Sequence, residues 1–123
     1  MSVCLVAGTK AVVVATSLFT LSWTHSVEKV RWEEDWRLTP AGLIVEEARV
    51  KGSGAGMDPP EGAAFSNGWW RYRPTLAPIE ELRLGVSGAT GQGWRLCADG
   101  RCLELEDTFP AVEAIAVARC TGE

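Results

Sequence analysis

The chain has 123 residues, of which 46% are hydrophobic and 23% charged, the composition of an ordinary globular protein. This length accommodates one domain with its own core, spanning residues 1–123, and leaves no room for a second folding unit. A net charge of −4 without any basic stripe argues against nucleic-acid binding. The six tryptophans suit a half-buried pleated surface better than helices.

The first fifteen residues contain two largely apolar stretches, Ser2–Ala7 and Ala11–Ala15. No positively charged region precedes them, and Lys10 interrupts them. A signal peptide or membrane-spanning helix needs a longer continuous apolar run. We therefore predict two strands here, and no signal, lipid anchor or transmembrane segment in the sequence as given.

The most regular pattern of the chain is an alternation of apolar and polar residues in Phe19–Val27 and again in Val30–Leu38. A period of two is typical of a strand with one apolar face. The two runs predict a hairpin whose apolar face holds several tryptophans and the single histidine, His25.

The register of this hairpin depends on the loop around Glu28 and Lys29. A loop of two or four residues centred there predicts three opposed pairs: His25 with Trp32, Trp23 with Glu34, and Leu21 with Trp36. A three-residue loop would move Glu34 to the other face, and Glu-Lys is not a preferred two-residue turn. For the even loop we predict that His25 and Glu34 lie within near-contact range, surrounded by Trp23, Trp32 and Trp36.

A turn at Thr39–Gly42 and a strand at Gly42–Lys51 follow. A four-residue loop would place Glu34 opposite Glu47, so that two carboxylates would meet on the face of the histidine. The same register pairs Leu38 with Leu43, Trp36 with Val45, and Trp32 with Arg49.

The rest of the chain also predicts strands. Gly52–Gly62 is a long loop, Ala64–Tyr72 is a short hairpin or bulged strand, and Leu82–Val86 alternates. Val112–Cys120 contains helix-forming residues but also alternates, and we interpret it as a strand. Eight to ten short strands without a convincing amphipathic helix predict an all-β domain, an antiparallel sandwich or small barrel.

The four cysteines predict two disulfides. Asp99-Gly100 is a strong signal for a two-residue turn, which places Cys97 and Cys102 in a non-hydrogen-bonded cross-strand pair, where side chains are closest. Cys4 and Cys120 would be joined if the first and last strands are neighbours. The alternative for each cysteine is a buried free thiol, and the spacing is poor for zinc.

Three groups of residues are candidates for a site. His25 with Glu34, Glu47 and Glu28 could bind a metal or exchange protons, although a core histidine bonded to a carboxylate explains the same residues. Gly54 and Gly56 could present backbone N–H groups to an anion, or could simply form a tight loop. Trp32 and Trp36 could line a ligand groove, or belong to the core.

No catalytic arrangement can be assembled from these residues. Ser26 follows His25 directly and would point to the opposite face of the strand. The sequence therefore favours a protein that is not an enzyme and has no cofactor, and it leaves a metal site open.

The chain resembles an uncharacterised bacterial family known as domain of unknown function 1850. Three segments carry the resemblance, which covers nearly the whole chain: the strand end His25–Glu28, the acidic-aromatic strand Glu33–Trp36, and the loop Gly54–Gly56. Members of that family often lie beside TRAP-type solute transporters of the TAXI class. The resemblance therefore implies a role near the cell envelope in solute uptake, and it implies no reaction.

Two hypotheses for the function follow. The first is a non-enzymatic accessory or binding module of the envelope, with TRAP-type transporter subunits as partners. The second is a small-ligand or metal-binding protein, enzymatic or not, that uses His25 and its neighbouring carboxylates. The cysteines and the resemblance favour the periplasm or cell envelope, whereas the lack of a signal peptide would favour the cytoplasm.

Overall fold

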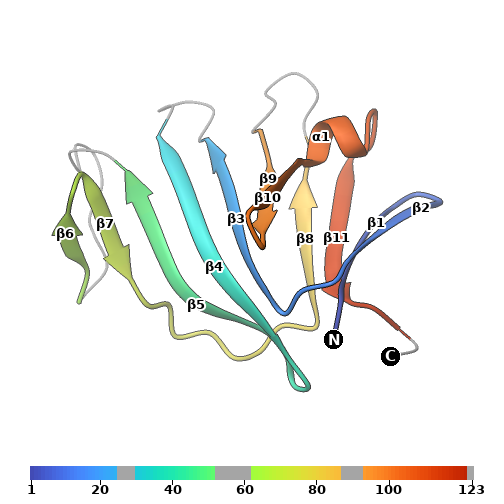
Figure 1. Cartoon of the computed structure of the whole chain (residues 1–123). Coiled ribbons are helices and arrows are strands. Elements are labelled where there is room, and N and C mark those ends of the chain that lie inside the picture. The colour runs from blue at the N-terminus through green and yellow to red at the C-terminus, as the bar shows by residue number, and fades with distance from the viewer. Residues whose placement is uncertain (25–29, 52–61, 87–92, 122–123) are drawn as a thin grey trace.

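The computed structural model describes residues 1–24, 30–51, 62–86 and 93–121. Within these ranges the chain forms eleven strands and one short helix, and the strands make two antiparallel sheets (Figure 1). The sheets pack face to face, which confirms the predicted all-β sandwich over the alternative of a barrel. The strands number one more than the predicted eight to ten.

The smaller sheet contains the two ends of the chain. Val3, Leu5, Ile115 and Val117 alternate along its two central strands and are fully buried against the larger sheet. The alternation in Val112–Cys120 therefore indicated a strand correctly. In spatial order the strands are β2 (Lys10–Val14), β1 (Val3–Ala7), β11 (Ala114–Arg119) and β8 (Glu81–Gly85).

The larger sheet provides the other half of the core. Phe19, Leu21, Trp36 and Leu38 from its central strands are at most 3% exposed. We call the side of this sheet that carries them its inward face. Its strands, in spatial order, are β10 (Arg101–Glu104), β9 (Arg95–Ala98), β3 (Leu18–Thr24), β4 (Arg31–Thr39), β5 (Gly42–Lys51), β7 (Trp69–Tyr72) and β6 (Ala64–Ser66).

Both predicted disulfides are present. Asp99 and Gly100 have φ angles of 53° and 78°, as a type I′ turn requires, and Cys97 lies opposite Cys102 with a Cα–Cα distance of 4.0 Å. The second bridge joins β1 to the end of β11, because these strands are neighbours. In it, the Cα atoms of Cys4 and Cys120 are 4.9 Å apart.

The register predicted for β3 and β4 is wrong by two residues. Trp32 lies opposite Trp23 and not opposite His25, and Glu34 lies opposite Leu21. Six residues lie between the paired Thr24 and Arg31, in place of the two or four of the predicted loop. Since six is even, the parity holds, and the described members of the predicted set, Trp23, Trp32, Glu34 and Trp36, share the inward face.

The register predicted for β4 and β5 is correct only near the turn. Leu38 pairs with Leu43 and Trp36 with Val45, but a β-bulge at Glu46 then shifts the alignment by one residue. Glu34 consequently lies opposite Ala48, and Trp32 opposite Val50. Two predictions are therefore wrong: Glu47 does not meet Glu34, and Arg49 does not face Trp32.

One short helix was not predicted. The single turn α1 (Leu105–Thr108) follows β10, and the N–H of Phe109 donates to the carbonyl of Leu105 over 2.8 Å. Leu105 and Phe109 are both at most 1% exposed, so the turn brings two large side chains into one end of the core. Its four residues are too few for a recognisable helical period.

Gly42 begins β5 where the backbone of Ile79 crosses the sheet edge. Its φ is +128°, and a Cβ atom there would lie 2.8 Å from the Ile79 carbonyl oxygen. Two hydrogen bonds of 2.7 and 2.9 Å between Leu43 and Ile79 hold the two segments together. Only glycine therefore fits at this position.

Replacing Gly42 by alanine should lower the free energy of unfolding by about 2–3 kcal/mol, because it adds a steric clash to an unfavourable φ. Gly68→Ala is the matched control, since Gly68 also has a positive φ of 85° but has open space around it. It should cost about 1 kcal/mol. Urea unfolding measures both, and equal losses would show that Gly42 is not needed for the close approach.

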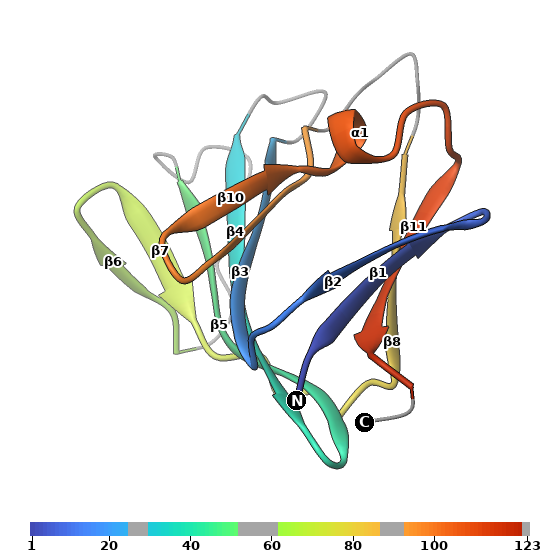
Figure 2. The same ribbon diagram turned by 45° about the vertical axis from the view of Figure 1, so that its right-hand side comes forward.

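The smaller sheet covers only part of the larger one. In Figures 1 and 2, β6 and β7 form the edge of the larger sheet that lies farthest from the smaller sheet. Ala48 and Val50 on β5 are 1% exposed, but they do not belong to the core cluster formed between the two sheets. The inward face of β4, β5 and β7 thus has a second group of side chains beside the main core.

Candidate functional site

Half-buried side chains beside Ala48, Val50 and the main core form a surface that we call the tryptophan face. Every member lies on the inward face and is half-buried. In the strand pairing of the larger sheet, Trp23 lies opposite Trp32. Val50 lies between Trp32 and Trp70, and Ala48 lies between Glu34 and Tyr72. The tryptophan face consists of Trp23, Trp32, Glu34, Trp70 and Tyr72.

Aromatic contacts form two separate groups on this face. The rings of Trp23 and Trp32 are stacked, with centroids 6.1 Å apart and planes inclined by 9°. Trp23 also contacts Trp94 at 4.9 Å, and Trp70 contacts Phe65 edge-on at 5.0 Å. Such pairs stabilise their own geometry, so the rings form a preorganised surface.

Glu34 is the one charged residue among the described inward residues of β3, β4, β5 and β7. The indole Nε1 of Trp36 donates to its Oε1 over 3.1 Å. Burial raises the pKa of Glu34, and this hydrogen bond only partly opposes the rise. The carboxylate is therefore held in surroundings that disfavour its charge.

Two further polar groups lie on this face. Burial raises the pKa of the Tyr72 hydroxyl, and the nearby charge of Glu34 raises it further. The Nε1 of Trp70 is buried and has no hydrogen-bond partner among the described residues. A buried donor without an acceptor costs about 1–3 kcal/mol, and its presence in a native fold needs an explanation.

The opposite, outward face of the same strands is charged, and its described arginines are all paired with carboxylates. Arg49 donates to Glu33 and Glu47 at 2.8 Å and to Asp35 at 2.8 and 3.1 Å. Arg71 reaches Glu47 at 3.2 Å. We call Arg49 and its three carboxylates the Arg49 network.

The Arg49 network sets the protonation of its members. Burial by itself would raise the pKa of Asp35, but hydrogen bonds from Arg49 and Thr20 and attraction to Arg49 and Arg71 outweigh it and lower that pKa. The bond to Asp35 is the largest cause of a raised pKa for Arg49. Both groups are thus held in their charged forms, in contrast to Glu34.

Replacing Glu34 by glutamine should raise the stability of the protein at pH 7. A carboxyl group whose pKa is raised on folding stabilises the fold below its unfolded pKa of 4.5, and that contribution is lost as the pH rises through the folded value. Glutamine does not ionise, so the protein no longer loses this stability as the pH rises. Its side-chain oxygen can still accept the hydrogen bond from Trp36. The gain, measured by urea unfolding, should disappear at pH 4.

The adjacent Glu33→Gln is the matched control for this prediction. Glu33 bonds Arg49 at 2.8 Å and Arg31 at 3.2 Å on the outward face. Its replacement should therefore lower stability, by about 1–2 kcal/mol at pH 7. If both substitutions changed stability in the same direction, Glu34 would not be in a desolvated position.

The predicted site residues fall into three sets. Trp32, Trp36 and Glu34 do share the inward face, with Trp23 beside them. Glu47 does not, because the bulge turns it to the outward face, where it binds Arg49 and Arg71. The other candidates lie outside the described residues, and their roles stay predictions: His25, Ser26, Glu28, Gly54 and Gly56.

Trp70 and Tyr72 belong to this face but were not among the predicted site residues. They follow the turn at Asn67-Gly68, whose φ angles are 54° and 85°, and they are two residues apart on β7. An Asn-Gly turn followed by this spacing is a recognisable sign of two side chains on one face of a hairpin.

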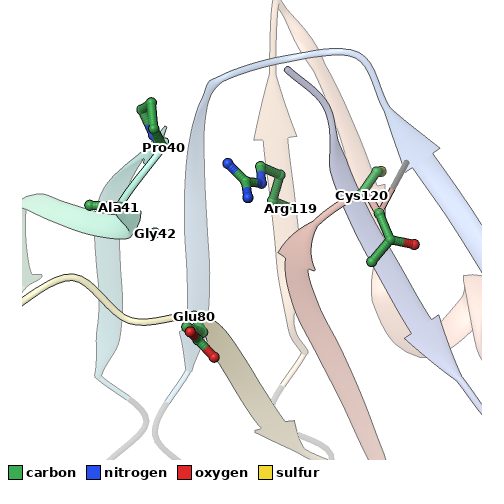
Figure 3. A pocket seen from close by; sticks show the side chains of 7 residues that line it. Pro40, Ala41, Gly42, Glu80, Arg119 and Cys120 are labelled. Atoms are coloured by element: carbon green, nitrogen blue, oxygen red, sulfur yellow. The ribbon is translucent and has the colours of Figure 1, made fainter. Parts of the chain in front are cut away.

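A separate polar pocket of about 370 Å³ lies at the other end of the sandwich. Figure 3 shows Arg119 reaching from the end of β11 toward the β4–β5 turn, with Glu80 on the neighbouring segment. The lining contains one negatively charged residue, Glu80, and one positively charged residue, Arg119, and Arg119 is exposed. This arrangement does not select an anion or a cation.

The described residues contain no cluster of three or more histidine, cysteine, aspartate or glutamate side chains that could hold a metal ion. No helix in the described part of the chain is long and apolar enough to span a membrane.

Comparison with known proteins gives one result. The family described as "Domain of unknown function (DUF1850)" matches residues 19–105, which include β3 from Phe19 onward, all of β4 to β10, and the whole tryptophan face. The chain belongs to this family. No curated protein and no solved structure matches the DUF1850 chain.

Proposed function

We propose that this DUF1850 protein is a non-enzymatic binding module of the cell envelope that acts with a TRAP-type solute transporter. The observation that supports a binding role is the tryptophan face, where four aromatic side chains and a carboxylate remain half-buried beside the core. Tryptophan and tyrosine are enriched at recognition surfaces because they offer large rigid contact areas. A surface of this kind needs a ligand or partner to bury it.

Two other observations support the location and the transporter link. Both pairs of cysteines form disulfides, which are typical of proteins that fold in an oxidising compartment such as the periplasm. The resemblance in His25–Glu28 and Glu33–Trp36 is to a family whose members often lie beside TAXI-class transporters. Together they favour a function outside the cytoplasm and close to solute uptake.

Co-purification tests the transporter link. The tagged protein is co-expressed with the membrane subunits of a TRAP transporter, and the complex is recovered after detergent extraction. We expect the subunits to be retained at a level well above that of a tagged β-sandwich of similar size and charge. Recovery equal to that of this control would contradict the link.

The hypothesis of a metal site loses one of its predicted ligands, because Glu47 lies on the outward face. Metal analysis of the purified protein still tests it. Stoichiometric metal that is lost in His25→Ala and kept in Glu47→Gln would favour a metal site over the proposed binding module.

A further inference from the structure

Within the described parts of the chain, Glu34 has no cationic partner on the inward face. Among the described residues no lysine or arginine forms an ion pair with it, and only one of its two oxygens receives a hydrogen bond. A carboxylate accepts several hydrogen bonds or one cation when its surroundings supply them. The free oxygen therefore leaves capacity for a positively charged group.

The arginines of the neighbouring strands cannot supply this charge. Arg31 and Arg49 are bonded to Glu33, and Arg37 is paired with Glu46, all on the outward face. Arg71 is held by Glu47 on that same face. A cation for Glu34 has to come from outside these strands.

The aromatic side chains around Glu34 favour a particular kind of cation. The π faces of tryptophan and tyrosine attract positive charge, and they also bury apolar groups. A metal ion or a small hydrated ion would gain little from such surroundings, since it needs oxygen ligands. An ammonium or guanidinium group with alkyl substituents satisfies both the carboxylate and the rings.

We propose that the tryptophan face binds a small organic cation, such as an alkylated ammonium, with Glu34 as its counter-charge and Trp32 and Trp70 as its aromatic walls. The inference deepens the proposed binding role and rests on it, but it does not depend on the transporter link. Glu34 is only half-buried, so part of this residue remains exposed to solvent.

Isothermal titration with choline and with its neutral isostere 3,3-dimethylbutan-1-ol tests the proposal on the whole protein. Choline should bind at least about 10-fold more tightly than the neutral alcohol, because only choline carries the charge. Glu34→Gln and Trp32→Leu should each weaken choline binding by about 10-fold or more.

The outward face provides matched controls on the same strands. Glu33→Gln and Trp69→Leu should leave choline binding unchanged, because Glu33 bonds Arg49 and the Trp69 ring lies 5.8 Å from the Lys51 ammonium. Circular dichroism verifies that each variant is folded.

Three outcomes would overturn the proposal: no measurable choline binding, equal binding of the neutral alcohol, or equal losses in the inward and outward variants. If choline failed to bind but Trp32→Leu abolished recovery of the transporter subunits, the tryptophan face would be a protein-docking surface. In that case the proposed function would stand and the cation inference would fall.

Discussion

Removing the disulfide between Cys4 and Cys120 should destabilise the protein by about 4–5 kcal/mol, the largest effect we expect from any substitution, since the bridge closes nearly the whole chain. The two cysteines are 116 residues apart in sequence, so the bridge removes much of the entropy of the unfolded state. The double variant Cys4→Ala/Cys120→Ala should therefore lose a large part of a stability that is about 5–15 kcal/mol for a domain of this kind.

The bridge between Cys97 and Cys102 is the internal control. It spans five residues of a tight hairpin, and its removal should cost only about 2 kcal/mol on the same entropic argument. Urea unfolding without reductant compares the two double variants. A loss for the terminal pair no greater than that for the hairpin pair would contradict a stabilising link between β1 and β11.

Replacing Arg49 by methionine should cost about 2–4 kcal/mol at pH 7, because it removes the one cation that Glu33, Asp35 and Glu47 share. The Arg49 side chain is only 13% exposed, whereas its partners are 20–37% exposed, so water screens the repulsion in part. Methionine retains the apolar stem of the side chain, so the substitution removes mainly the charge.

The pH dependence of this variant has a definite sign. In the wild type, Asp35 has a lowered pKa, so it stabilises the fold above its unfolded value of 3.8 and loses that effect as the pH falls through the folded value. In Arg49→Met this stabilisation is reduced, because only Thr20 and Arg71 still favour the charged form of Asp35, and protonation relieves the repulsion between the carboxylates. The difference in unfolding free energy between the two proteins should therefore be greatest near pH 7 and shrink below pH 4.

Arg37→Met is the control for Arg49→Met. Arg37 lies on the adjacent strand and meets Glu46 at 3.4 Å, but both side chains are well exposed, at 50% and 39%. Its replacement should change stability by no more than about 1 kcal/mol at any pH. Equal effects of the two substitutions would show that the Arg49 network is only a surface ion pair.

The sequence predicted the fold best where a short turn determines the register. Asp99-Gly100 allows essentially one two-residue turn, and the pairing of Cys97 with Cys102 follows from it. The turn beginning at Thr39 likewise set Leu38 against Leu43. Parity along Phe19–Leu38 then identified which tryptophans share a face, because side chains alternate along any strand.

The sequence could not reveal the features that depend on nonlocal packing. The bulge at Glu46 follows from how β4 and β5 meet, and it moves Glu47 from the predicted site into the Arg49 network. The alternation of apolar and polar residues along the sequence does not reveal where a strand contains an extra, bulged residue. It therefore cannot show which carboxylates the bulge turns to the outward face. Nor does it show that the smaller sheet stops short of β7, which is what leaves Trp70 and Tyr72 beside Glu34.

The central claim is that the tryptophan face is a binding surface, and the indole N–H signals of the six tryptophans test it most directly. In a ¹⁵N NMR titration with choline, the signals of Trp32 and Trp70 should shift in proportion to saturation, and the signal of Trp36 should follow through its bond to Glu34. The signal of Trp69 on the outward face should not move. Shifts confined to Trp69, or no shift of any inward tryptophan at saturating choline, would contradict the claim.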